Sequence, residues 1–231
     1  MMTNRFFLGS LLHLSDPTLP IGGYTHSNGL ETYVQQGIVH NTATAEQFVQ
    51  QMLTANLHFN DAAFVCLAYQ ATAENNLPAL LLLDAELSAL KLPTEIRNAS
   101  QKLGLRLIKI FRRQKEFAFA AAYENAITTK QTDGHYAIAF GVYASLLEIP
   151  LPEALYAFFY NAAAGMVTNA VKLVPLSQLD GQDILFRMQP VIAGLVDKTI
   201  QLDRDLVGVC NTGFDIRCMQ HERLYSRLYM S

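Results

Sequence analysis

The sequence predicts an all-α protein, a single-domain bundle of roughly eight to ten helices that spans residues 1–231 and ends in a C-terminal docking tail. Three observations lead to this fold class. Apolar residues recur with the helical period of about 3.6 residues along most of the chain, and alternating strand patterns are scarce. No linker rich in Pro, Gly or Ser divides the sequence. Hydrophobic residues make up 51% of it, which is enough for a sizeable core.

Four helices are expected between residues 44 and 115. Those at 44–58 and 61–74 are separated near Asn60, and a leucine-rich helix follows at 78–90. Thr94 can cap a long helix that runs to about residue 115, because a threonine hydroxyl accepts hydrogen bonds from the amides of a first helical turn.

Four more helices are expected between residues 117 and 207. The turn "TTKQTDGH" separates helices at 117–129 and 136–147, and a last helix is expected at 182–207. Pro152 can stand in the first turn of a helix that reaches about residue 174. The apolar residues of this helix share one broad face: Leu155, Phe158, Phe159, Ala162, Met166 and Leu173.

The segment of about 208–231, which we expect to be flexible and call the tail, has an unusual composition for a chain end. Termini are usually frayed and polar, but Leu224, Tyr225, Leu228 and Tyr229 stand close together here. These side chains either dock on the parent domain or wait for a partner. We expect the tail from about residue 213 to be a docking element rather than part of the core.

Composition and charge exclude several classes of protein. A net charge of −3 gives no general electrostatic reason to bind nucleic acid. Three cysteines at irregular spacing and no secretory pattern at the N-terminus favour a reduced, cytoplasmic location. Residues 154–171 carry no charge but contain polar residues, so we interpret them as a buried helix rather than a membrane span.

Motifs of known chemistry are absent or incomplete. The sequence holds no phosphate-binding loop, dinucleotide fingerprint or nucleophile elbow. "HERLY" begins like a zinc-protease helix, but Tyr225 stands where the second histidine would be. Cys218 and His221 are three residues apart and could share a helix face, yet a closed zinc site needs about four ligands. We therefore expect no catalytic residue and no stable metal or cofactor.

A basic stripe is expected on the helix that begins near Thr94. Its members, Lys102, Arg106, Lys109 and Arg113, follow the spacing of one helix face. Such a stripe is most often solvated surface, and the functional alternative is a docking face for an acidic partner.

The stretch "LPIGGYTHSNGLE", residues 19–31, is called the hinge below. Its glycines frame a polar and aromatic cluster that could serve catalysis or partner binding. Catalysis would require an acid, a base and a recognisable pocket, of which only Glu31 is apparent. The pattern favours binding. The alternative is a helical small-molecule enzyme or sensor that uses Tyr24, His26 and Glu31.

Four stretches together resemble the urease accessory protein family UreF. The hinge resembles the family's N-terminal signature, "LPTEIRNASQKLGLRLI" its central segment, "NAVKLVPLSQLDGQ" a late helix–turn segment, and "MQHERLYSRLYMS" its C-terminal tail. They occur in the family's order along the chain. Three positions depart from the commonest family form: Ser177 replaces a frequent glycine, His26 a frequent tyrosine and Met230 a frequent arginine.

The resemblance implies a non-enzymatic, all-α, homodimeric nickel-insertion chaperone. Family members bridge the accessory protein UreD (also called UreH) and the GTPase UreG, which deliver Ni²⁺ to the urease apoenzyme. The family's GTPase-recruiting tyrosine and arginine match Tyr24 and Arg227. Its tail becomes ordered with UreD, which implies this UreD-binding set: Met219, His221, Glu222, Leu224, Tyr225, Ser226, Leu228 and Tyr229.

Overall fold

The computed structural model describes residues 6–23 and 26–230, which form helices joined by turns and loops and contain no strand. This confirms the all-α prediction. In chain order the helical elements are α1 (Phe6–Leu14), α2 (Leu30–Gln35), α3 (Thr42–Gln51), the π-helix η2 (Met52–Leu57), α4 (Asp61–Ala73), α5 (Leu77–Leu90), α6 (Thr94–Phe111), α7 (Ala118–Thr128), α8 (Tyr136–Leu146), α9 (Leu151–Leu173), α10 (Gln178–Ile200), the short 3₁₀ helix η3 (Arg204–Leu206) and α11 (Thr212–His221).

All eight expected helices are present, and α6 and α10 differ most from their predicted bounds. Thr94 is the first residue of α6 rather than its cap, and the helix ends at Phe111 instead of near residue 115. The last long helix begins earlier, at Gln178, because Ser177 and Asp180 form a reciprocal capping box. It continues through Pro190 and ends at Ile200, after which the chain turns.

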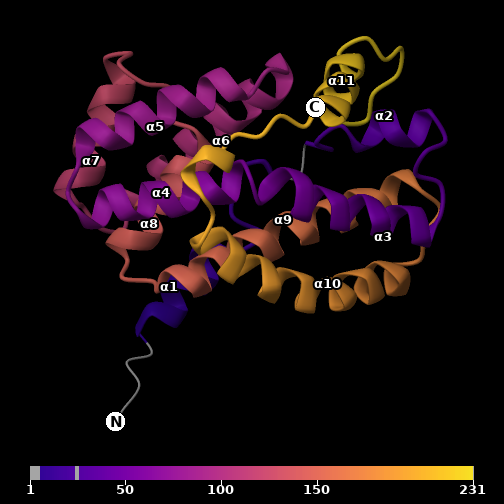
Figure 1. The fold of residues 1–231 in the computed structure, drawn as a ribbon, viewed down its shortest axis with the longest axis horizontal. Helices are drawn as coiled ribbons and strands as arrows, with labels where there is room; N and C mark the ends of the chain where they lie inside the picture. The colour runs from indigo at the N-terminus through magenta and orange to yellow at the C-terminus, as the bar shows by residue number, and fades with distance from the viewer. Residues whose placement is uncertain (1–5, 24–25, 231) are drawn as a thin grey trace.

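Two groups of helices make up the body of the molecule (Figure 1). In the first, α8 is buried from Ala137 to Ala144 and packs against α4 and α6. Gly141 allows the closest approach, since a Cβ atom there would lie 2.5 Å from the carbonyl oxygen of Val65 on α4. In the second group α3, α9 and α10 lie side by side. The helix α9 buries ten of its residues, so the expected buried helix is confirmed. Among the described residues, no helix combines the length and apolarity needed to span a bilayer.

A buried carboxylate organises the loop that leads into α8. Asp84 of α5 is fully buried and accepts hydrogen bonds from the Thr132 hydroxyl and from three consecutive backbone amides. The N···O distances are 3.1 Å to Asp133, 2.7 Å to Gly134 and 2.9 Å to His135. Asp84 thus satisfies the backbone amides of the loop residues 133–135, which lead directly into α8.

Replacing Asp84 with alanine is expected to lower the free energy of unfolding by about 3 kcal/mol or more, because two buried amides, one part-buried amide and the Thr132 hydroxyl lose their acceptor. Chemical denaturation monitored by circular dichroism measures this loss. Glu86, on the same helix, pairs with Arg204 at the surface, and Glu86→Ala should change stability by no more than about 1 kcal/mol. Equal losses in the two variants would contradict the assigned role of Asp84.

Candidate partner-binding face

The hinge is fastened to the helical body at two backbone carbonyls. The Arg106 guanidinium of α6 donates a hydrogen bond of 2.8 Å to the oxygen of Ile21, and the Asn169 amide of α9 donates one of 2.8 Å to the oxygen of His26. Gly22 has a φ of 86°, and a Cβ atom there would lie 2.2 Å from the Arg106 nitrogen. The positive φ favours glycine at this position, and a larger residue would also displace the end of the Arg106 side chain. Tyr24 and Thr25 lie outside the described residues.

The end of the hinge brings α2 against the tail. Gly29, with a φ of 77°, caps α2, and a Cβ atom there would lie 2.8 Å from the sulfur of Cys218 on α11. Leu30 is fully buried in the core, and the side chain of Glu31 points toward the tail, where it accepts hydrogen bonds. In the "GLE" triplet, Gly29 therefore permits the close approach of α11, Leu30 packs in the core, and Glu31 supplies a buried carboxylate.

The tail contains a helix that packs on α2 and α6 (Figure 1). The Asn211 side chain caps α11, and Phe214, Cys218 and His221 are buried. Because Phe214 and Cys218 belong to the hydrophobic core, the expectation that the tail stays outside the core is wrong for this helix. The sequence prediction gave too little weight to Phe214, which packs across a segment distant in sequence.

Four side chains hold the end of the tail on α2 and α6; we call Glu31, Glu95, His221 and Arg227 the clamp. Glu31 accepts hydrogen bonds from two consecutive tail amides, at 2.7 Å from Leu228 and 3.2 Å from Tyr229. Glu95 of α6 accepts one of 2.6 Å from the Arg227 guanidinium. His221 lies between the carboxylates, with Nδ1 2.7 Å from Glu95 and Nε2 3.2 Å from Glu31.

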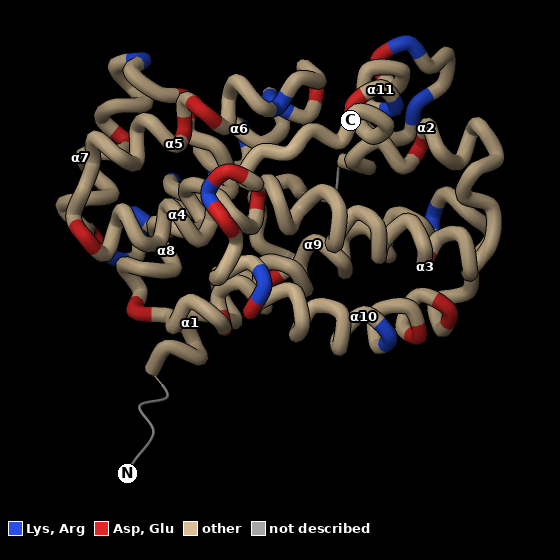
Figure 2. Tube along the Cα trace, in the orientation of Figure 1, with Lys and Arg blue, Asp and Glu red and all other residues tan. Residues whose placement is uncertain are grey.

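The predicted partner-binding residues of the tail divide into exposed and buried groups. Met219, Glu222, Tyr225, Ser226, Arg227 and Leu228 are exposed, Leu224 is half-buried, and His221 and Tyr229 are buried. Gln35 of α2 donates a hydrogen bond of 3.0 Å to the backbone oxygen of Ser226, which further fixes this segment. Charged positions of both signs gather on α2, α11 and the tail, whereas α9 is mostly uncharged (Figure 2).

The structure engages Cys218 and His221 in other contacts. Burial raises the pKa of the Cys218 thiol, so the sulfur is protonated at neutral pH, and both ring nitrogens of His221 face carboxylates. Within residues 6–23 and 26–230, no group of three or more His, Cys, Asp or Glu side chains is arranged to hold a metal ion.

The basic stripe is shorter than expected. Lys102, Arg106 and Lys109 are exposed on α6, but the helix ends at Phe111 and Arg113 follows in a turn. Arg106 also fastens the hinge through its bond to Ile21, a role that helical spacing could not indicate. Lys102 and Lys109 are the other two members that lie exposed on the face of α6.

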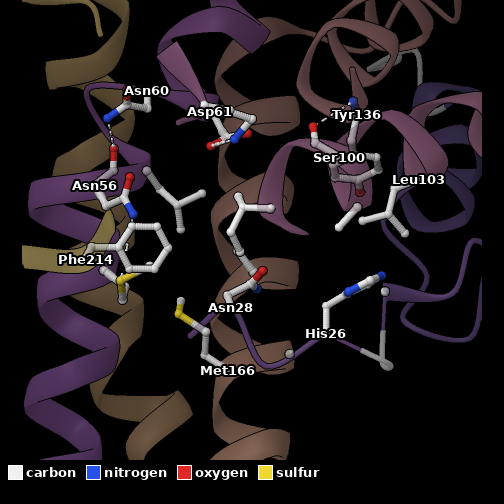
Figure 3. A pocket seen from close by; sticks show the side chains of 18 of the residues that line it. His26, Asn28, Asn56, Asn60, Asp61, Ser100, Leu103, Tyr136, Met166 and Phe214 are labelled. Atoms are coloured by element: carbon white, nitrogen blue, oxygen red, sulfur yellow. Dashed lines mark hydrogen bonds and ion pairs between the residues drawn. The ribbon is translucent and has the colours of Figure 1, made fainter. Parts of the chain in front are cut away.

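A cavity of about 490 Å³ lies beside the hinge, between α6, α9 and the start of the tail (Figure 3). His26 and Asn28 of the hinge line it, together with Tyr136 of α8 and Phe214 of α11. Burial, followed by the positive charges of Lys102 and Arg106, lowers the pKa of His26. Glu31 is not among the lining residues, because it is engaged in the clamp. The structure therefore does not bring His26 and Glu31 together in one cavity.

The sequence of this chain matches the UreF family profile over residues 39–189. The chain belongs to the UreF family. It is 51% identical over 224 residues to the urease accessory protein UreF of Actinobacillus pleuropneumoniae serotype 5b (strain L20), which covers 97% of this chain and 99% of that protein. The identity is 49% over 224 residues with UreF of Haemophilus influenzae (strain ATCC 51907 / DSM 11121 / KW20 / Rd), and the match covers 97% of this chain and 95% of that protein. The identity is 33% over 222 residues with UreF of Bacillus sp. (strain TB-90), and the match covers 96% of this chain and 98% of that protein.

Some functional candidates of this UreF-family chain were missed from the sequence. Glu95 was not singled out, although it stands in the "LPTEIR" segment, and Glu31 was considered only as a catalytic acid. Both carboxylates serve to anchor the tail. The available signal was charge complementarity, because these two acids precede a tail that contains three arginines and one histidine.

Proposed function

We propose that this UreF-family chain is a non-enzymatic component of the nickel-insertion machinery of urease. It would bridge UreD (also called UreH) and the GTPase UreG and modulate GTP hydrolysis by UreG. Ni²⁺ would pass through the assembly to the urease apoenzyme as cargo, without a resident site in this chain. The clamp is the observation that carries the proposal, because it fixes Arg227 and the exposed tail residues on α2 and α6. The residues of the clamp stand in sequence segments that resemble those of the family.

Two partners would use different parts of this face. Arg227, together with Tyr24, would receive the GTPase, because arginine and tyrosine are the residue types most often found as interface hot spots. The exposed tail residues Met219, Tyr225 and Leu228 would contact UreD, since they present apolar surface that the chain itself leaves uncovered. His221 and Tyr229 are buried and would act by holding the tail in shape.

We further propose that the chain works in the cytoplasm as a homodimer. Exposed apolar side chains on α1 and α10, among them Phe6, Leu12, Leu179 and Phe186, offer surface that a second copy could cover. Light scattering after size-exclusion chromatography should give twice the mass of one chain. On co-expression with UreD and the GTPase, all three proteins should elute as one complex. A monomer that remains separate from both partners would contradict the proposal.

The basic stripe is expected to steer an acidic partner. Replacing both Lys102 and Lys109 with glutamate should slow association and reduce its salt dependence, because exposed charges act mainly on the encounter rate. Stopped-flow or surface-plasmon measurements at low and high salt test this. Arg106 is kept in the variant because it fastens the hinge. Association kinetics at low salt equal to those of the unmodified chain would show that the stripe is only solvated surface.

A small-molecule-binding protein or sensor is the second candidate, and the cavity beside the hinge is the observation in its favour. A ligand there would meet mostly apolar walls, with Tyr136 and Asn28 among the polar lining residues. Native mass spectrometry of the purified chain distinguishes the two functions. A retained ligand of constant mass favours the sensor, whereas an unliganded chain that binds UreD and the GTPase favours the adaptor.

A further inference from the structure

The hinge is anchored to the helical body from two sides. Its first anchor is the carbonyl oxygen of Ile21, which accepts a hydrogen bond of 2.8 Å from the Arg106 guanidinium of α6. Its second anchor is the carbonyl oxygen of His26, which accepts one of 2.8 Å from the Asn169 amide of α9. Because α6 belongs to the first group of helices and α9 to the second, the path of the hinge depends on both groups (Figure 1).

Both anchors belong to buried residues. The side chains of Ile21 and His26 are buried, and Ser27, which follows, is fully buried. The hydrogen bond from Asn169 is buried and the one from Arg106 is partly buried. A buried carbonyl group that loses its donor costs free energy, so these two bonds restrict where the backbone of the hinge can run.

The sequence between the two anchors explains why such a restriction matters. Four residues separate Ile21 from His26, and the first two of them are Gly22 and Gly23. Glycine has the largest backbone freedom of all residues, so a segment of this composition loses much conformational entropy when a partner orders it. Anchors on both sides remove part of that entropy before the partner binds, which lowers the cost of binding.

We propose that Arg106 and Asn169 are positioning residues for reception of the GTPase, because together they arrange the hinge in advance from its two sides. This inference rests on the proposed function, since it concerns binding of the GTPase at the hinge. Neither residue has to touch the partner for this role. The GTPase meets a hinge whose backbone is already ordered and therefore binds it more tightly than an untethered hinge.

The charge of Arg106 has to be separated from its hydrogen bond, because Arg106 is also a member of the basic stripe. An exposed charge acts mainly on the encounter rate and is screened by salt, with a Debye length of about 3 Å at about 1 M. A tether to the backbone acts on the order of the hinge at every salt concentration. The loss of affinity in Arg106→Met should therefore persist at high salt.

The chain supplies a matched control for each tether. On α6, the Arg97 guanidinium donates a hydrogen bond of 2.9 Å to the backbone oxygen of Lys91, which lies outside the hinge. On α9, the Asn161 amide donates one of 3.2 Å to the backbone oxygen of Ser15, which also lies outside the hinge. Arg97→Met and Asn161→Asp thus remove the same kind of bond from the same two helices and leave the hinge anchored.

Isothermal titration of the GTPase into the chain–UreD complex, at low and at high salt, tests the proposal. Arg106→Met and Asn169→Asp should each weaken GTPase binding about fivefold, the equivalent of one hydrogen bond. The two control variants should bind the GTPase like the unmodified chain, and all four should keep the affinity for UreD. In the free chain, hydrogen exchange of residues 21–23 and 26–28 should be faster in the two tether variants than in the controls.

The outcomes separate this inference from the proposed function. If the unmodified complex does not bind the GTPase, the proposed function is wrong and the inference falls with it. If it does bind, but the tether variants bind as tightly as their controls, only the inference is wrong. A loss in Arg106→Met that disappears at high salt would also overturn it, because the charge would then be responsible. If Asn169→Asp does not fold, the comparison of Arg106→Met, at an exposed position, with Arg97→Met decides the question.

Discussion

Arg227→Ala is expected to weaken binding of the GTPase by at least about 2 kcal/mol, the cost typical of an interface hot spot. The guanidinium is held by Glu95 but remains 38% exposed, so it is oriented and still accessible to a partner. Tyr24→Ala should have an effect of the same size, while binding of UreD should survive it. Isothermal titration with the assembled chain–UreD complex measures both losses. In cells, each variant should leave urease protein abundant but poor in nickel.

The matched control is Arg187 on α10, which makes a comparable surface ion pair with Glu46. Arg187→Ala should leave GTPase binding unchanged. None of these arginine changes should lower the unfolding free energy by more than about 1 kcal/mol, since exposed ion pairs contribute little. GTPase binding at full affinity in both Arg227→Ala and Tyr24→Ala would contradict the hot-spot assignment. Unfolding of the Tyr24 variant would make that residue part of the core.

Deletion of residues 213–231 is expected to lower the free energy of unfolding by about 3 kcal/mol or more. Phe214 and Tyr229 are almost fully buried, and each large apolar side chain contributes about 1.5–3 kcal/mol through burial. The deletion also removes the hydrogen bonds that Glu31 accepts from the amides of Leu228 and Tyr229. Urea denaturation followed by circular dichroism measures the loss. Binding of UreD should be abolished as well.

A point substitution separates core packing from partner contact within the tail. Tyr225 is fully exposed, so Tyr225→Ala should change stability by no more than about 0.5 kcal/mol while it weakens UreD binding. Phe214→Ala should reproduce most of the stability loss of the deletion. A deletion variant with unchanged stability would show that the tail is peripheral after all.

Helix positions were predictable from the sequence because their determinants are local. The predicted helices 61–74 and 78–90 differ by a single residue at one end from α4 and α5. Capping is equally local, since the capping box of α10 is formed by Ser177 and Asp180. The sequence prediction treated this segment as a turn and did not use the pair to start the helix. The π-helix at Met52–Leu57 was predicted only as part of a continuous helix, because the apolar pattern does not distinguish the two hydrogen-bond registers over one turn.

The candidate site was predictable only in part, since its contacts join residues far apart in the chain. Glu31 and Leu228 are separated by 197 positions, and no periodicity links them. The hinge glycines were recognised as special, but the reasons lie in Arg106 and Cys218, which approach from α6 and α11. The cavity beside the hinge has the same origin, because several elements contribute its walls. Family resemblance indicated that the hinge and the tail take part in partner binding, and only the fold shows how these two segments contact each other.

The central claim is that the GTPase is received where the hinge and tail meet. Hydrogen-exchange mass spectrometry of the unmodified chain, compared between the chain–UreD complex and the complex with the GTPase added, tests it most directly. Addition of the GTPase should slow exchange in the hinge, residues 19–31, and near Arg227, while α10 packs on α3 and α9 and should be unaffected. Slower exchange confined to α10 or α7, with the hinge unchanged, would contradict the account.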